Sequence, residues 1–313
     1  MPHRSRVGVV VFGALFALPA GIAFAHNPVS PSAGAVGAAW SVEPLVVLPL
    51  VAVAWFYDMG VRSLWRRFGP RRVIHVQHIA AFVAAIALLV VALVSPLDAM
   101  SASLFSAHMA QHMLLVLAIP PLLLISRADL ALPAALPSGW QRNVRRSFHT
   151  RVLRQCTRLF LHPATAWWLF AGTFWLWHVP YLYDAALRHD SVHAAEHLAL
   201  LVAGLLFWRV VLRAAGQRAF PYHYAILFVF TTMLQMSMLA ALLTFSTHAW
   251  YPAYGPETAQ WGIGLVTDQR IGALVMWMTS NGVFLGLIAL LFARWFAVEE
   301  RRADHQVAPV TRA

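Results

Sequence analysis

Pairs of histidines at helical spacing are the residues of this sequence best suited to chemistry. His108 and His112 lie four positions apart, and His193 and His197 repeat that spacing on either side of Glu196. In an α-helix, residues four positions apart share a face and differ by about 6 Å in height. Two imidazoles placed in this way can bind one metal ion, and neutral imidazole suits copper, zinc, iron and nickel. The spacing therefore predicts a metal site.

Further polar side chains are expected at the same depth as these two pairs. His178 ends one apolar segment, and Asp268 opens the last one. A polar side chain within an apolar segment costs free energy unless it has a partner or a task. Glu196 and Asp268 can bind the ion or accept hydrogen bonds that fix the imidazoles. The candidate metal ligands are His108, His112, His178, His193, Glu196, His197 and Asp268.

Methionines point to copper more than to zinc. Met233 and Met236 share a helix face, and thioether sulfur is a soft ligand that favours Cu(I). We therefore add both methionines to the candidate ligands. The chain has one cysteine, Cys156, which excludes a Cys-x-x-Cys site within one chain. Copper is the expected metal, and zinc is the alternative.

The elements that must position these residues are membrane helices. Of the 313 residues, 60% are hydrophobic and 11% are charged, against about 25% charged in soluble domains, which argues against an ordinary cytosolic enzyme. Seven apolar segments are long enough to cross a bilayer, and within lipid each must close its own backbone hydrogen bonds as a helix. They run over 42–59, 77–95, 104–125, 164–183, 193–212, 222–246 and 270–297. We predict an all-α integral membrane protein with seven transmembrane helices.

The ends of the chain and its arginines set the expected orientation. Residues 1–25 resemble a cleavable signal peptide, so 26–41 would be an extracytoplasmic segment before the membrane domain 42–297. Nearly all loop arginines fall on one side, which the positive-inside rule makes cytoplasmic. The N-terminus is then outside and the tail 298–313 is cytoplasmic. The net charge of +11 reflects this topology and predicts no nucleic-acid partner.

Two local features complete this expectation. Pro120 and Pro121 should kink the helix that carries His108 and His112. The long cytoplasmic loop 126–163 has arginines at helical spacing, which predicts an interfacial helix on anionic lipid headgroups.

The succession of short motifs resembles the CtaG-type cytochrome c oxidase assembly factors, the multi-helix membrane type. The resemblance covers about residues 42–297. The motifs are His108 to Met113, Pro120 to Leu123, Trp177 to Pro180, His193 to His197 with Phe207-Trp208, Leu243 to Phe245, Tyr251 to Tyr254, and Asp268-Gln269 with Gly272 and Met276-Trp277. It implies a bacterial plasma-membrane protein that helps to mature a haem-copper oxidase by supplying copper to an oxidase subunit. The implied partners are cytochrome c oxidase subunits, the lipid bilayer and an extracytoplasmic copper donor.

Two other functions compete with this non-enzymatic role. The order His193-x-x-Glu196-His197 is that of inverted zinc peptidases, with Glu196 as general base. Seven-helix zinc hydrolases such as the alkaline ceramidases are similar in using histidines and an aspartate near one membrane face. A haem protein with His112 and His197 as axial ligands is the third hypothesis.

Overall fold

The computed structural model describes residues 39–148, 150–216 and 221–307, and all regular structure within them is helical. The prediction of an all-α protein is confirmed. The predicted signal peptide 1–25, and all but the last three residues of the segment 26–41, lie outside the described residues.

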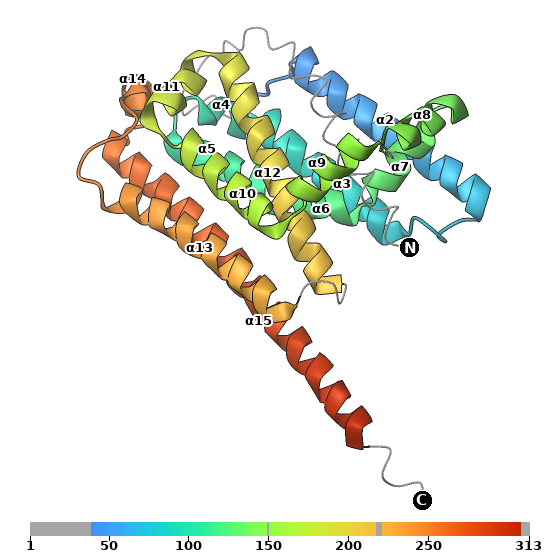
Figure 1. Ribbon diagram of the computed structural model, residues 1–313. Coiled ribbons are helices and arrows are strands. Elements are labelled where there is room, and N and C mark those ends of the chain that lie inside the picture. The colour runs from blue at the N-terminus through green and yellow to red at the C-terminus, as the bar shows by residue number, and fades with distance from the viewer. Residues whose placement is uncertain (1–38, 149, 217–220, 308–313) are drawn as a thin grey trace, which may run out of the picture.

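Figure 1 shows the order and arrangement of the helices. Their bounds are α2 Pro44–Phe68, α3 Val76–Leu93, α4 Pro96–Ser101, α5 Phe105–Met113, a π-helical turn Leu114–Ala118, α6 Ile119–Ile125, α7 Ala128–Ala135, α8 Ser138–Phe148, α9 Arg151–Phe160, α10 Pro163–Trp177, α11 Pro180–Arg188, α12 Asp190–Gly216, α13 Tyr222–Phe245, a 3-10 turn Pro252–Tyr254, α14 Gly255–Ala259 and α15 Leu265–Val307.

Six helical stretches in the described part of the chain are long and apolar enough to cross a membrane. They are α2, α3, the composite helix from α5 to α6, α12, α13 and α15. The remaining expected span, 164–183, is divided between α10 and α11. The 15 residues of α10 extend about 22 Å, which is shorter than a hydrocarbon core of about 30 Å. The helix ends here because Pro180 disfavours the α conformation at Val179, whose backbone is extended with φ −66° and ψ 125°.

The helix α12 is the central element for the site. It packs against α10 on one side and against α6 and the π-helical turn on another. The helices α13 and α15 form an antiparallel pair, and α15 also packs along α5 (Figure 1). The last turns of α15 extend beyond the bundle to Val307, so the helix continues past the predicted end of the membrane domain at residue 297.

Where the sequence predicts a kink at Pro120 and Pro121, the structure has a π-helical turn that ends two residues before Pro120. A proline at position 120 cannot donate the helical hydrogen bond to the carbonyl of Val116. The indole Nε1 of Trp208 on α12 donates to that carbonyl instead, at 3.0 Å. Gly204 permits this close approach, because a Cβ there would lie 2.9 Å from Pro120 Cγ. Pro120 therefore accounts both for the distortion of this helix and for its contact with Trp208 on α12.

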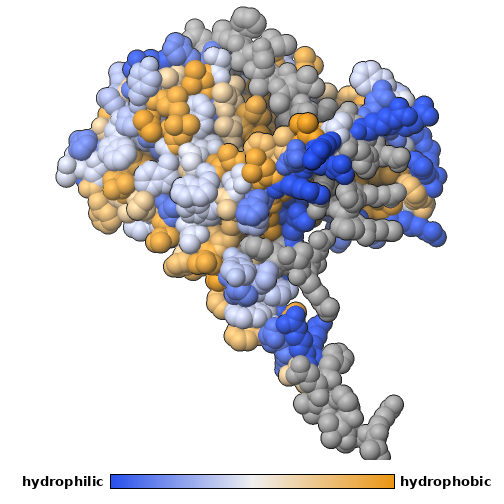
Figure 2. Space-filling view, viewed as in Figure 1, coloured by the Kyte–Doolittle hydropathy of each residue, from blue (hydrophilic) through white to orange (hydrophobic). Residues whose placement is uncertain are grey.

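The loop 126–163, which we predict to be cytoplasmic, forms three short helices, α7, α8 and α9. On α9, Arg151, Arg154 and Arg158 share one face, while Val152 and Leu159 on another face are 69% and 59% exposed. Figure 2 shows hydrophilic residues gathered over this region and along the last turns of α15, with hydrophobic residues over much of the bundle. The helical part of the loop prediction is confirmed, and its contact with lipid headgroups stays a prediction.

Candidate metal centre

A buried pair of histidines on α5 faces a buried carboxylate on α12. The Nε2 atoms of His108 and His112 lie 2.7 Å apart, and each lies 3.6 Å from one carboxylate oxygen of Glu196. All three residues are fully buried. We call His108, His112 and Glu196 the inner triad; one donor atom from each lies within 4.8 Å of the other two.

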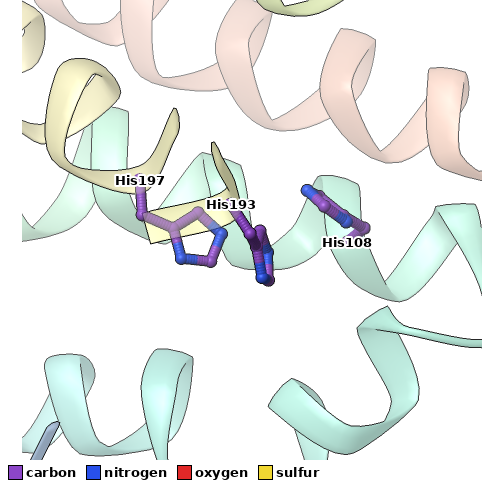
Figure 3. Close-up of side chains that lie close together, drawn as sticks. All are labelled: His108, His193 and His197. Carbon is purple, nitrogen blue, oxygen red and sulfur yellow. The ribbon is translucent and has the colours of Figure 1, made fainter. Parts of the chain in front are cut away.

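A second group of donors shares His108 with the first. One ring nitrogen from each of His108, His193 and His197 lies within 4.8 Å of the others, and we call these residues the outer triad. Figure 3 shows the two rings from α12 beside the ring of His108 from α5. The ring centroids of His193 and His197 are 4.1 Å apart, and that of His193 is 5.3 Å from His108. His193 and His197 are half-buried, so the outer triad is the more accessible of the two.

His178 lies at the edge of this cluster, where α10 ends. Its ring centroid is 6.3 Å from that of His112. Its Nδ1 is 2.7 Å from the carbonyl oxygen of Phe174, which can only accept, so Nδ1 is the donor. In the neutral ring the buried Nε2 then carries a lone pair, and it makes no hydrogen bond to any described residue. A fixed ring with a bare nitrogen is the state that a metal ligand needs.

Tyr254, in the segment before α14, fixes the ring of His108 in the same way. Its hydroxyl donates to the carbonyl of Ser101 at 3.0 Å and lies 3.1 Å from Nδ1 of His108. Because the one phenol proton goes to Ser101, Nδ1 of His108 must donate to the phenol oxygen. The Nε2 of a neutral His108 then has no proton, and in the contact with His112 the proton belongs to His112. An ion bound between these two Nε2 atoms requires His112 to carry its proton on Nδ1 instead.

Tyr251 and Tyr254 form a buried aromatic cap over the cluster. The Tyr251 hydroxyl donates to the carbonyl of His178 at 2.9 Å, next to the His178 ring. Burial, as the largest cause, raises the pKa of both phenols well above the usual value of tyrosine. Both side chains are therefore neutral donors throughout the physiological pH range. Tyr183 adds its hydroxyl at 3.1 Å from that of Tyr254.

Asp268 holds the start of α5 in place. Its carboxylate accepts the backbone N–H of Phe105 at 2.6 Å and that of Ser106 at 3.3 Å, together with the Ser106 hydroxyl. These are N–H groups that a helix start leaves unpaired, and Leu104 at the N-cap offers no side chain to accept them. Gly272 allows α15 to come this close, because a Cβ there would lie 2.4 Å from Phe105 Cδ1. Asp268 thus orients the helix that carries two of the donors.

The structure brings together five of the nine predicted ligands, His108, His112, His193, Glu196 and His197, in the two triads, with His178 at their edge. Asp268 contacts the start of α5 instead, and metal ligation by it stays a prediction. Met236 is buried in the hydrophobic core and Met233 packs against that core. Ligation by either methionine also stays a prediction.

The sequence gives no sign of the roles of Tyr251 and Tyr254 at the site. Both tyrosines lie in a motif of the family resemblance, but nothing local indicates which histidine a loop tyrosine will contact.

The donor set fits a single copper or zinc ion. Four imidazoles and one carboxylate are available, and a metal to nitrogen distance of about 2.0–2.1 Å places two ligands of a tetrahedral ion about 3.3 Å apart. The His108 and His112 rings would separate by about 0.6 Å to reach this spacing from 2.7 Å. A haem held by His112 and His197 fits less well. It would displace His108, whose ring centroid lies 4.2 Å from His112 and 5.9 Å from His197.

Comparisons with known proteins agree with the resemblance. Uncharacterized proteins of Mycobacterium bovis and Mycobacterium tuberculosis are each 27% identical to this chain over 288 residues, which is 89% of the chain and 42% of the relative. An uncharacterized protein of Mycobacterium leprae is 29% identical over 211 residues, 66% of the chain and 31% of that relative. The chain thus spans less than half the length of these relatives. No solved structure shows significant similarity to it.

The match to a protein family covers most of the chain, residues 55–297, and includes every donor of both triads. With its long apolar helices, this match shows that the chain is a membrane protein of the cytochrome c oxidase caa3 assembly factor family.

Proposed function

We propose that this protein binds Cu(I) at the histidine cluster and passes it to a subunit of a haem-copper cytochrome c oxidase during assembly. The observation that carries the proposal is the burial of His108, His112 and Glu196 with their donor atoms facing one another. Such a group is costly within a membrane bundle unless it serves a task. Membership in an oxidase assembly family supports copper as the cargo.

The donor set supports transfer as well as binding. Copper and zinc sites use three or four protein ligands, while the two triads together offer five. A surplus of ligands lets an incoming donor or acceptor protein replace one bond at a time, so the ion is never released into apolar surroundings. His178, at the rim, adds a further nitrogen for such an exchange.

The topology that we propose places this cluster near the outer face of a bacterial plasma membrane. It has seven crossings, with the short α10 as the fourth, the N-terminus outside after removal of a signal peptide, and the C-terminus in the cytoplasm. The arginines of the loops support this orientation. A copper donor on the outer side and an oxidase subunit in the membrane are the proposed partners.

A zinc-dependent hydrolase is the second candidate. It is favoured by the outer triad, because three histidines with an open fourth position are a known catalytic zinc arrangement and Glu196 lies beside it as a candidate base. The variant Glu196→Gln separates the two functions. A hydrolase loses its activity in this variant and keeps its metal, whereas a copper carrier has no hydrolytic activity to lose.

Binding of Cu(I) by the purified, detergent-solubilised protein tests the first function. The wild-type protein is expected to retain one Cu(I) per chain against a colorimetric chelator, and the double variant His108→Ala, His112→Ala is expected to retain none. His248→Ala is the matched control, since this histidine lies in an exposed loop between α13 and α14. In cells, the double variant should lower the copper content and activity of the oxidase.

The proposal fails if the wild-type protein binds no Cu(I) under these conditions, or if the double variant binds it as tightly as the control does. A zinc ion bound in the purified protein, together with a hydrolytic activity that Glu196→Gln removes, would select the second candidate.

A further inference from the structure

The donors of the metal centre form two overlapping groups rather than one shell. Each triad contributes three ligand atoms within 4.8 Å of one another, and only His108 belongs to both. A single copper or zinc ion uses at most about four protein ligands. One ion therefore cannot bind all five donors at once. The cluster offers the ion two neighbouring positions, which share His108 as a ligand.

The two positions differ in charge. The inner triad contains the carboxylate of Glu196, which lies 3.6 Å from both imidazole nitrogens, whereas the outer triad offers three imidazoles. In a medium of low dielectric constant a cation gains far more from an adjacent negative charge than it does in water. The inner position is therefore the more favourable one for a bound cation.

The two positions also differ in access. Every residue of the inner triad is fully buried, while the rings of His193 and His197 are partly exposed on the first turns of α12, although their Nε2 atoms are buried. An incoming ligand therefore meets the rings of the outer triad before it meets His112 or Glu196. A partner protein can therefore exchange ligands with His193 and His197 but cannot approach His112 or Glu196 without opening the bundle.

His108 is suited to connect the two positions. Tyr254 holds its Nδ1 at 3.1 Å, which leaves Nε2 as the nitrogen that faces His112 and Glu196. Its ring centroid is 5.3 Å from that of His193, and a ligand atom of His108 lies within 4.8 Å of the other donors of each triad, so the ring can serve either position while Tyr254 holds it. One ligand can thus stay bound to the ion as the other two are replaced.

From these differences we infer that the site is a two-position relay, in which Cu(I) is exchanged with partners at the outer triad and held at the inner triad, with His108 bound throughout. This inference rests on the proposed function, because it assumes that the same side chains bind copper. No electron is transferred; imidazole nitrogens of His193 and His197 are replaced by the nitrogen of His112 and an oxygen of Glu196.

Equilibrium and rate measurements on two matched double variants test the relay. Loading and removal of Cu(I) are followed with a colorimetric chelator, and the copper X-ray absorption spectrum of the loaded protein reports the ligands. In His193→Asn, His197→Asn, loading and removal should both slow, with a small change in affinity and an unchanged spectrum. In His112→Asn, Glu196→Gln, the affinity should fall by more than the roughly 10- to 100-fold that loss of an outer hydrogen-bond partner of a ligand costs, and the spectrum should change. His189→Asn, an exposed histidine next to α12, is the control.

The relay is wrong if both variants lose affinity equally and both change the spectrum, since the donors then act as one shell. It is also wrong if the wild-type protein holds two copper ions per chain, because the triads are then separate sites. These outcomes leave copper binding intact. Absence of Cu(I) binding by the wild-type protein is a different result, and it refutes the proposed function itself. Helical circular dichroism and thermal unfolding show that each variant is folded before it is used.

Discussion

The hydroxyl of Tyr254 lies 3.1 Å from Nδ1 of His108, and through this contact a loop outside the membrane helices orients a donor inside them. The two residues are 146 positions apart in the sequence. Tyr254 also donates to Ser101, which precedes α5. The cap is therefore attached both to the donor ring and to the chain that leads into its helix.

Replacement of this hydroxyl should weaken metal binding without removing any ligand. In Tyr254→Phe the carbonyl of Ser101 loses its donor and His108 is free to change tautomer. Loss of such an outer contact costs about 10- to 100-fold in metal affinity, and an unpaired buried group costs about 1–3 kcal/mol of stability. Chelator competition and thermal unfolding measure the two effects. Tyr181→Phe, with a side chain that is 87% exposed, should change neither. Equal Cu(I) affinity in Tyr254→Phe and wild type would contradict this role.

Asp268 should act on stability more than on metal affinity. In Asp268→Ala the backbone N–H groups of Phe105 and Ser106 lose their acceptor, which costs about 1–2 kcal/mol for a helix cap. We expect a lower unfolding temperature, with Cu(I) affinity reduced less than in the variant His108→Ala. Glu257→Gln, in the same outer segment, is the control. A complete loss of copper from a folded Asp268→Ala protein would make Asp268 a ligand, as the sequence pattern predicted.

Two glycines of α15 provide a test of its packing against α5 and a matched control. A Cβ at Gly272 would lie 2.4 Å from Phe105 Cδ1 and 3.0 Å from Ser106 Cα, whereas nothing lies within 4 Å of a Cβ at Gly282. Gly272→Ala should destabilise the protein by about 1–3 kcal/mol through overpacking. Gly282→Ala should be neutral or stabilising by up to about 1 kcal/mol, because alanine favours the helix. Thermal unfolding in detergent compares them, and equal unfolding temperatures would show that α15 does not press on α5.

Exchange of both methionines for leucine should leave copper affinity unchanged. Met236 is fully buried in the core and Met233 packs against it, so a swap that conserves volume costs less than about 1.5 kcal/mol. Chelator competition on Met233→Leu, Met236→Leu gives the test. A tenfold weaker affinity in the folded variant would instead support the predicted ligation by the thioethers.

Stability should fall above about pH 10 because of the aromatic cap. Burial raises the pKa of Tyr251 and Tyr254 in the folded protein, so their contribution is complete below about pH 10, where an unfolded tyrosine begins to ionise. Above that pH each tyrosine lowers the free energy of unfolding by about 1.4 kcal/mol per pH unit. Unfolding at several pH values should therefore give a smaller slope for Tyr254→Phe than for wild type. Identical slopes would show that Tyr254 is not buried as described.

The part of the site that depends on local spacing could be predicted from the sequence. His108 and His112, like His193 and His197, share a helix face because they lie four positions apart. Their common depth followed from the limits of the apolar segments. The four-residue spacing and the depth can each be read from a single helix. In a compact bundle, histidines at the same depth on α5 and α12 then come close together.

The rest depended on contacts between distant parts of the chain. The contact between Tyr254 and His108 joins a loop to a helix, and no pattern within either segment indicates it. Asp268 was expected near the ligands because of its depth, but no local pattern indicated that it accepts the backbone N–H groups at the start of α5. Pro180 is a local signal for the break after α10. The prediction of one continuous span over 164–183, made from hydropathy, did not take that proline into account. Hydropathy averages over a window, whereas a proline acts on one residue.

The π-helical turn Leu114–Ala118 fixes the rotational phase of α5 relative to α6. Each residue of an α-helix advances the chain by about 100° around the axis. If the same five residues formed a regular α-helix with none removed, His108 and His112 would swing by about that angle relative to α6, away from Glu196. Five apolar residues that donate to no ion thus decide in which direction the imidazoles face.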